Sequence, residues 1–104
     1  QNTYEYDIVL PSGEKVDVKT KQTSVTPQPD YECSVANRNT TQKCDSYAFV
    51  RVKNDFTVGW YLGKINKDDF WKKSVFLKKG EIDGSNNYRV RADCYNIKIN
   101  ELNI

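Results

Sequence analysis

The stretch YDIVLPSGEKVDVKTK, residues 6–21, decides how the chain begins to fold. At its centre, Pro11-Ser12-Gly13 suits a three-residue hairpin loop. Proline fits the first turn position, and glycine fits the left-handed position that forms a bulge. Aromatic and β-branched residues precede this turn, and polar and apolar residues alternate strictly after it, which is typical of strands. We therefore predict a β-hairpin with strands over residues 4–10 and 15–21.

The loop length also predicts the register of the hairpin and the faces of its strands. The expected pairs are Leu10 with Glu14, Val9 with Lys15, Ile8 with Val16, and Asp7 with Asp17. Because strand side chains alternate between faces, Lys19 shares the face of the two aspartates, and Glu5 lies across from it. We expect the opposite face to join the core, through Tyr4, Tyr6, Ile8, Leu10, Val16 and Val18.

The two opposed aspartates indicate a cation site. Like charges directly opposite each other destabilise a hairpin by up to about 1 kcal/mol, and burial increases that cost. Two Asp oxygens, a backbone carbonyl and waters form a hard oxygen site suited to Mg²⁺ or Mn²⁺. With a lysine beside it to orient or deprotonate water, such a site describes metal-assisted phosphodiester hydrolysis.

A simpler interpretation of the same residues is open. Asp7 and Asp17 would then be ordinary exposed strand residues, balanced by Lys15, Lys19 and Lys21. Alternating charge on a solvated strand face is common, and a slip of one residue in the register would separate the two aspartates onto opposite faces.

The rest of the chain predicts more strands and one clear helix. The expected strands cover residues 31–36, 46–53, 57–65, 88–94 and 96–99, and residues 23–30, 37–43 and 81–87 are expected to form loops or turns. A helix is expected after Asn66 as N-cap, with acidic residues in its first turn, Val75 within it and its end before Gly80. The fold class is α/β (α+β), with a mixed β-sheet flanked by few helices.

Composition limits the class of protein. The 104 residues, 38% of them hydrophobic, make one domain over residues 1–104, and no apolar run approaches a membrane span. The absence of histidine excludes His-based triads and His-containing zinc sites. The three cysteines, Cys33, Cys44 and Cys94, form no CxxC pair, which favours free, mostly buried thiols and a reducing compartment.

Charge is nearly balanced over the chain, with 16 basic and 14 acidic residues. Between Lys64 and Lys79, however, six lysines accompany two aspartates, a local net charge of +4. This segment could contact phosphates, although a solvated helix face has the same composition.

The pattern of Asp7, nine residues, then Asp17-Val18-Lys19 resembles the catalytic signature of the PD-(D/E)XK nuclease superfamily, which has the restriction-endonuclease-like fold. The downstream order of two strands, a lysine-rich helix and a closing strand is also similar to its small members. The resemblance implies that Asp7, Asp17 and the Val18 backbone carbonyl bind Mg²⁺ or Mn²⁺ and that Lys19 assists the attacking water. It implies weaker phosphate contacts by three further residues, Lys15, Lys21 and Gln22.

Two departures from the family pattern stand out. Tyr6 occupies the place of the signature's proline, a variable position that is not a metal ligand. The helix that normally precedes the first strand, often with an additional acidic residue, is missing, so we expect an N-terminal segment to be lacking.

The resulting hypothesis is a Mg²⁺-dependent DNA endonuclease of the restriction, repair or junction-resolving type, cytoplasmic and encoded by a bacterium or a phage. DNA is the expected partner, a homodimer is an open alternative, and no membrane association is expected. A second hypothesis is a non-catalytic nucleic-acid-binding module on the same scaffold. A third is a small β-rich interaction domain that binds protein or glycan through aromatic residues, with Tyr31, Tyr47, Trp60 and Trp71 as candidates.

Overall fold

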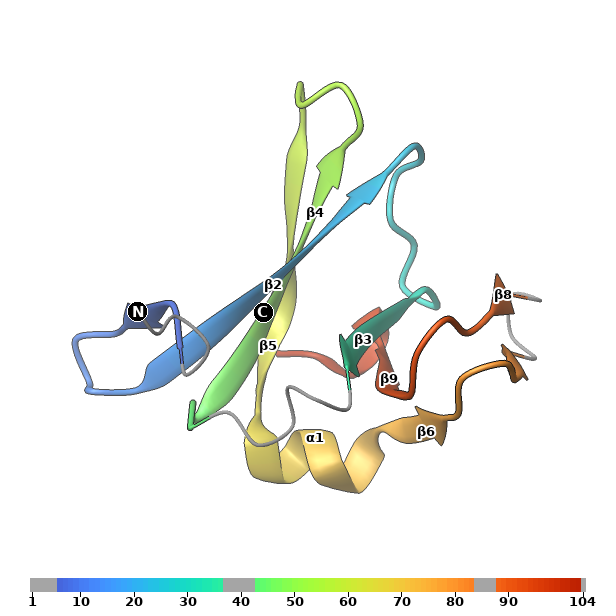
Figure 1. Ribbon diagram of the computed structural model, residues 1–104. Helices are drawn as coiled ribbons and strands as arrows, with labels where there is room; N and C mark the ends of the chain where they lie inside the picture. The colour runs from blue at the N-terminus through green and yellow to red at the C-terminus, as the bar shows by residue number, and fades with distance from the viewer. Residues whose placement is uncertain (1–5, 37–42, 84–87, 104) are drawn as a thin grey trace.

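The computed structural model describes residues 6–36, 43–83 and 88–103. They form nine strands, one α-helix and one 3₁₀ helix within these ranges (Figure 1). The elements in chain order are β1 (Ile8–Val9), β2 (Lys15–Thr23), β3 (Glu32–Ala36), β4 (Ser46–Lys53), β5 (Gly59–Asn66), α1 (Lys67–Lys73), β6 (Val75–Leu77), β7 (Ile82–Asp83), β8 (Tyr88–Arg89), β9 (Cys94–Lys98) and η2 (Ile99–Glu101). No helix in the described ranges is long and apolar enough to cross a membrane.

The strands form two main sheets and a short separate hairpin. The first sheet has the order β1-β2-β4-β5, and it is mixed because β2 and β4 run parallel while the outer pairs are antiparallel. The second sheet has the order β3-β9-β6 and is antiparallel. A parallel pair needs a long crossover, and the segment that contains β3 supplies it. The predicted α+β class and mixed sheet are confirmed, but the closing strand β9 lies in the second sheet.

The hydrophobic core lies where the two sheets and α1 meet. Tyr47 of β4 and Phe70 of α1 are completely buried, and their rings meet edge to face with centroids 5.2 Å apart. The other core side chains come from both sheets and from Cys44, which lies just before β4: Cys33, Val35, Phe49, Leu62, Ile65 and Ile97. The inner face of the first sheet is therefore the face that carries Tyr47 and Phe49.

This arrangement corrects the predicted faces of the hairpin. Paired residues in neighbouring strands share a face, and β2 pairs Asp17 with Tyr47. The aspartate face is thus the inner one. Of the residues expected in the core, Val16 is buried, but Ile8 is 47% and Tyr6 is 38% exposed. Leu10 and Val18 are half-buried, and Tyr4 lies outside the described residues.

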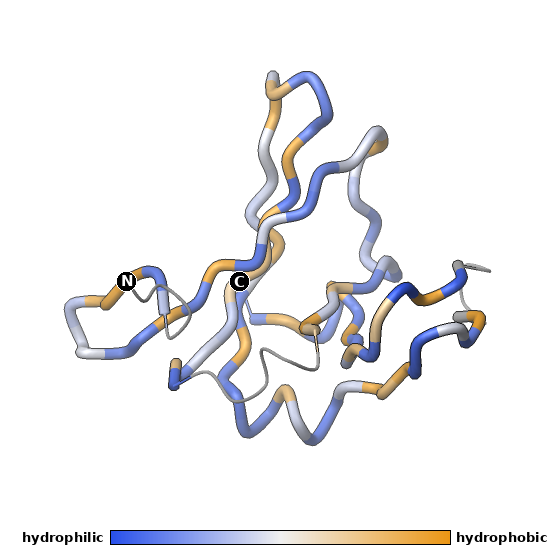
Figure 2. Tube along the Cα trace, in the orientation of Figure 1, coloured by the Kyte–Doolittle hydropathy of each residue, from blue (hydrophilic) through white to orange (hydrophobic). Residues whose placement is uncertain are grey.

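The physical reason for the correction is the short β1. Its two residues lie at the outer end of the first sheet, away from the second sheet (Figures 1 and 2). Figure 2 also shows that apolar residues along the strands are interrupted by hydrophilic ones. Hydrophobic alternation within the hairpin marks two faces but does not say which face the remainder of the chain covers.

The helix begins as predicted and ends earlier than predicted. The Asn66 side chain accepts a hydrogen bond from the backbone N–H of Asp69, at 2.8 Å. The helix ends at Lys73, and Val75 begins β6 instead, where it pairs with Asn96 of β9. Pairing with β9 therefore overrides the continuation of the helix.

The predictions for the other strands are confirmed in part. The predicted strand 46–53 coincides with β4, and the strand 31–36 contains β3. The region 81–87, predicted as a loop, contains β7, and the strand predicted over 88–94 is reduced to β8. β9 includes most of the strand predicted over 96–99, and most of the predicted turn over 37–43 lies outside the described residues.

The prediction of free, mostly buried thiols is confirmed. All are free, with Cys33 and Cys44 buried and Cys94 half-buried. Burial raises the pKa of the Cys33 thiol to about 11 and also raises the pKa of Cys44, so both are protonated at neutral pH. Neither thiol has the thiolate character of a nucleophile.

Candidate functional site

The predicted turn of the first hairpin is confirmed, and its register is confirmed over β1, which does not include the predicted pair of Asp7 with Asp17. Gly13 has a φ of +93° and donates its N–H to the Leu10 carbonyl at 2.8 Å. On either side of this turn, Ile8 pairs with Val16, and Val9 pairs with Lys15. A positive φ is the conformation that glycine adopts without steric cost, so the turn sets the register from local sequence alone.

Asp7 lies just before β1 and bonds to β2 through both backbone and side chain. Its N–H donates to the Val16 carbonyl at 2.9 Å, and its Oδ2 accepts the Val18 N–H at 2.7 Å. The N–H and C=O of one strand residue point to the same side of the strand, so the Val18 carbonyl faces this edge as well. The Asp7 carboxylate and the Val18 carbonyl are thereby brought to one place.

Asp17 is the buried member of the site. Its residue is 4% exposed, and its Oδ2 lies 2.7 Å from the Lys19 Nζ. Burial raises the pKa of the Asp17 carboxyl above its usual range, and the charge and hydrogen bond of Asp7 raise it further, while Lys19 acts in the opposite direction. Asp7, Asp17 and Lys19 therefore form one cluster, as the sequence predicts.

Tyr47 is a neighbour of this cluster that sequence reasoning assigned to a different role. The Lys19 Nζ lies 5.7 Å from the centre of its ring, and burial together with the nearby Cys44 and Asp17 raises the pKa of its hydroxyl. That hydroxyl is buried and has no hydrogen-bond partner among the described residues. The parallel pairing of Asp17 with Tyr47 creates the contact, and no local pattern in the sequence predicts that pairing.

The oxygen donors at the hairpin edge are few. Within the described ranges, no group of three or more His, Cys, Asp or Glu side chains could hold a metal ion. The available donors are the carboxylates of Asp7 and Asp17, which lie within hydrogen-bonding range of each other, and the Val18 carbonyl at the same edge. Mg²⁺ is commonly held by one or two carboxylates and keeps several waters, so this small donor set suits it.

The residues predicted to make weaker phosphate contacts lie on both faces of β2. Lys21 shares the inner face with Lys19 and lines a cavity beside it. Gln22, one residue further along, is exposed and lies on the opposite face by alternation. Lys15 is exposed, its backbone N–H bonds to the Asp45 carboxylate at 2.9 Å, and its Nζ lies 5.5 Å from the centre of the Tyr6 ring.

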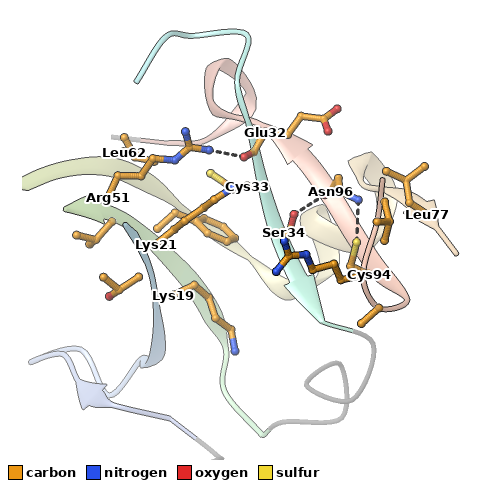
Figure 3. A pocket seen from close by; sticks show the side chains of 16 residues that line it. Lys19, Lys21, Glu32, Cys33, Ser34, Arg51, Leu62, Leu77, Cys94 and Asn96 are labelled. Atoms are coloured by element: carbon orange, nitrogen blue, oxygen red, sulfur yellow. Dashed lines mark hydrogen bonds between the residues drawn. The ribbon is translucent and has the colours of Figure 1, made fainter. Parts of the chain in front are cut away.

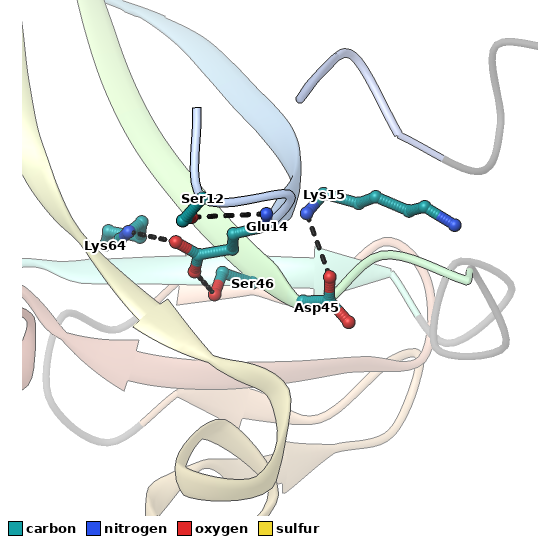
Figure 4. Close-up of polar contacts among 6 residues, drawn as sticks. All are labelled: Ser12, Glu14, Lys15, Asp45, Ser46 and Lys64. Carbon is teal, nitrogen blue, oxygen red and sulfur yellow. Dashed lines mark hydrogen bonds and ion pairs between the residues drawn. The ribbon is translucent and has the colours of Figure 1, made fainter. Parts of the chain in front are cut away.

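A second polar cluster joins the hairpin to the rest of the first sheet (Figure 4). The Glu14 carboxylate accepts hydrogen bonds from Ser46 Oγ of β4 and from Lys64 Nζ of β5, the latter at 2.7 Å. These two contacts lower the pKa of Glu14 below its usual value. Lys64 is thus ion-paired, and the other lysines of its segment are distributed over α1 and the residues after β6.

The aromatic residues considered for a binding surface are mainly structural. Tyr47 is buried in the core, and Tyr31 and Trp60 are half-buried. Trp71 is 39% exposed and packs edge to face on Tyr95, with centroids 4.8 Å apart. These positions give little support to a flat aromatic recognition surface.

No family model matches this chain, and no curated protein or solved structure matches it either. The functional argument therefore depends on the chemistry of the Asp7–Asp17–Lys19 cluster.

The raised pKa of Asp17 leads to a prediction about stability. A carboxyl group whose pKa is higher in the folded state than in the unfolded state binds its proton more tightly when the protein is folded. The protonated group therefore stabilises the fold at low pH, and this contribution is lost as the pH rises through the folded-state pKa. The ionised Asp17 should therefore destabilise the metal-free protein at neutral pH. We expect Asp17→Asn to raise the melting temperature at pH 7 in EDTA, with the difference disappearing in acid.

Asp55→Asn is the matched control for this measurement. Hydrogen bonds from Thr57 lower the pKa of Asp55, so its ionised form stabilises the fold, and the substitution should lower the melting temperature at pH 7. A lower melting temperature for Asp17→Asn at pH 7 would show that the ion pair with Lys19 outweighs burial.

Proposed function

We propose that this chain is a metal-dependent DNA endonuclease of the PD-(D/E)XK type, belonging to its restriction, repair or junction-resolving enzymes. The observation that carries the proposal is the meeting of Asp7, Asp17 and Lys19 at the edge of the first hairpin. Two carboxylates in contact, one of them buried, repel each other unless a proton or a cation lies between them. A lysine beside such a pair is the arrangement expected for phosphodiester hydrolysis.

Each residue has a stated task in the proposed reaction. Asp7, Asp17 and the Val18 carbonyl would hold Mg²⁺ or Mn²⁺, which when bound polarises a phosphoryl oxygen and lowers the pKa of a coordinated water. The Lys19 ammonium, held 2.7 Å from Asp17, orients the attacking water and neutralises charge on the phosphoryl oxygens. The water oxygen bonds to phosphorus as the water releases a proton to solvent, the bond to the leaving sugar oxygen breaks, and the leaving oxygen takes up a proton from solvent.

The inner face of β2 supports an anionic substrate. Lys19 and Lys21 lie on this face, and Arg51 of β4 pairs with Lys21 in the parallel register. Three cationic residues thus follow one line across the two central strands, beginning at the carboxylates. Contacts between such residues and phosphates release counterions, so DNA binding should weaken steeply with salt.

Calorimetry with Mn²⁺ and Mg²⁺ tests the proposal. We expect the wild-type chain to bind the ion and Asp17→Asn to lose that binding, because the substitution removes the buried anionic ligand. The matched control is Asp68→Asn, which removes an exposed carboxylate from α1 and should leave binding unchanged. A plasmid-nicking assay with the same three proteins follows.

Two results would contradict the nuclease. One is no ion binding by folded wild-type protein even with DNA oligonucleotide present. The other is cleavage that persists in Asp17→Asn and in EDTA. Salt-sensitive DNA binding without any effect of the ion would instead favour the non-catalytic nucleic-acid-binding module.

A further inference from the structure

A cavity of about 440 Å³ opens next to the candidate site, between the two sheets (Figure 3). Its lining comes from strands of both sheets and from residues 90–92. Lys19 lines this cavity, and its ammonium is also bonded to Asp17. Lys19 therefore connects the cavity to the carboxylate pair. The size of the cavity lies within the range of small-molecule sites.

The lining is strongly cationic. Lys19, Lys21, Arg51 and Arg91 line the cavity, and Glu32 is the one acidic residue in its lining. The formal balance is 4 − 1, or +3, which exceeds the net charge of +2 for the whole chain. A concave surface with this charge attracts anions and holds them more strongly than an open surface does.

Arg51 gives the cavity a fixed, buried donor. It is 6% exposed, and its Nη2 donates to the Glu32 carbonyl at 2.6 Å (Figure 3). Its guanidinium lies 5.6 Å from the centre of the Tyr31 ring. The contact with the Tyr31 ring and the hydrogen bond restrict the orientation of the guanidinium. A preorganised guanidinium loses little freedom when it binds the oxygens of a phosphate.

The remaining walls suit a base and a sugar. Phe49, Leu62 and Leu77 contribute apolar surface, while Ser34 and Asn96 contribute polar atoms that are hydrogen-bonded to each other. Flat bases bind through aromatic and apolar surface, and their edges bind to polar groups. Apolar, polar and cationic surface are therefore all present in one cavity.

We propose that this cavity binds a single nucleotide, with its phosphate on Lys21, Arg51 and Arg91 and its base between the sheets. The proposal deepens the proposed function, because Lys19 joins the cavity to the carboxylates, and it rests on that function for the consequence in cleavage. A cavity of this size between two sheets has room for one unpaired nucleotide and not for a base pair. The substrate is then a single strand or an unpaired strand end, in preference to an intact duplex.

Fluorescence anisotropy in EDTA tests binding separately from cleavage. The probes are a labelled 5′-phosphorylated oligothymidylate and a blunt duplex, with thymidine monophosphate and inorganic phosphate as competitors. We expect the single strand to bind at least about tenfold more tightly than the duplex. We expect thymidine monophosphate to compete better than phosphate, because it also fills the apolar part of the cavity. If thymidine monophosphate competes no better than phosphate, the cavity does not bind the base.

Two double variants with equal loss of charge provide the control. Lys21→Gln with Arg91→Gln should weaken strand binding at least about tenfold, because charge-assisted contacts to phosphate are lost. Lys72→Gln with Lys73→Gln removes two exposed charges from α1 and should have less than about a twofold effect. Thermal unfolding verifies that both variants are folded. Equal weakening by the two variants, or equal binding of strand and duplex, would overturn the proposal.

Calorimetry with Mn²⁺ on the same variants separates this proposal from the proposed function. We expect Lys21→Gln with Arg91→Gln to keep the Mn²⁺ binding of the wild type while losing the strand. If no form binds Mn²⁺ but strand binding still depends on Lys21 and Arg91, the nuclease fails and the nucleotide cavity stands. If Mn²⁺ binds and strand binding does not depend on these residues, the cavity fails and the nuclease stands.

Discussion

Replacing Gly63 with alanine is expected to destabilise the folded protein by roughly 2–5 kcal/mol, from backbone strain and overpacking together. Gly63 has a φ of +136°, and a Cβ there would lie 2.8 Å from the Leu102 Cβ and 2.9 Å from the Asn103 carbonyl oxygen. The C-terminal segment cannot easily retreat, because Lys64 and Asn103 exchange backbone hydrogen bonds of 2.6 and 2.8 Å. The melting temperature should fall by more than about 10 °C.

Substitutions at two other glycines distinguish backbone strain from overpacking as the cause of the expected destabilisation. At Gly59 a Cβ would lie 3.8 Å from the Arg51 carbonyl oxygen, an ordinary contact, so Gly59→Ala should have little effect. At Gly80 the φ is +91° but nothing lies within 4 Å, so Gly80→Ala should reveal the backbone cost alone, about 1 kcal/mol. Chemical denaturation of the three variants gives the comparison. A Gly63→Ala protein as stable as Gly80→Ala would mean that the C-terminal segment does not pack against β5 as described.

The features that the sequence predicts well are set by neighbouring residues. The turn at Gly13 fixes the hairpin register, and Asn66 fixes the start of α1, because each acts through bonds within a few positions. The meeting of Asp7, Asp17 and Lys19 follows from that register together with strand alternation. Local chemistry therefore locates the candidate site before any tertiary contact is known.

The features that the sequence does not predict depend on which strands become neighbours. The parallel pairing of β2 with β4 decides that the aspartate face points inward, and it brings Tyr47 beside Asp17. The early end of α1 depends on β9, which pairs with Val75. The nucleotide cavity likewise combines residues from 19 to 96, so no window of the sequence contains it. The Glu14–Lys64 ion pair is of the same kind, because it joins residues fifty positions apart.

Burial of Asp17 and its contact with Lys19 bear on function and stability together. A buried carboxylate destabilises the metal-free fold, as its raised pKa indicates, yet the same burial makes it a strong ligand for a cation. Lys19 partly offsets that cost at a distance of 2.7 Å. A neutral residue at position 17 would make the metal-free fold more stable at neutral pH, so the charge of Asp17 agrees with the proposed cation site.

If the chain is the proposed nuclease, Lys19→Met is expected to lower the rate of DNA cleavage by about 10²- to 10³-fold, the range for loss of one preorganised donor that stabilises charge in the transition state. Methionine keeps much of the lysine stem, while the ammonium and its contact with the Tyr47 ring are lost. Single-turnover cleavage at saturating Mn²⁺ measures the effect on the chemical step. Lys53→Met, at the end of β4, is the control and should cleave at the wild-type rate.

Mn²⁺ calorimetry on Lys19→Met distinguishes a role in the reaction from a role in balancing charge. Without the ammonium, the pKa of Asp17 rises further, so ion binding should survive but require a higher pH than in the wild type. A lysine that acts in the reaction therefore predicts slow cleavage even at a pH where Mn²⁺ is fully bound. If cleavage by Lys19→Met returns to the wild-type rate at that pH, Lys19 acts solely as the counter-ion of Asp17, and the water is oriented by another group.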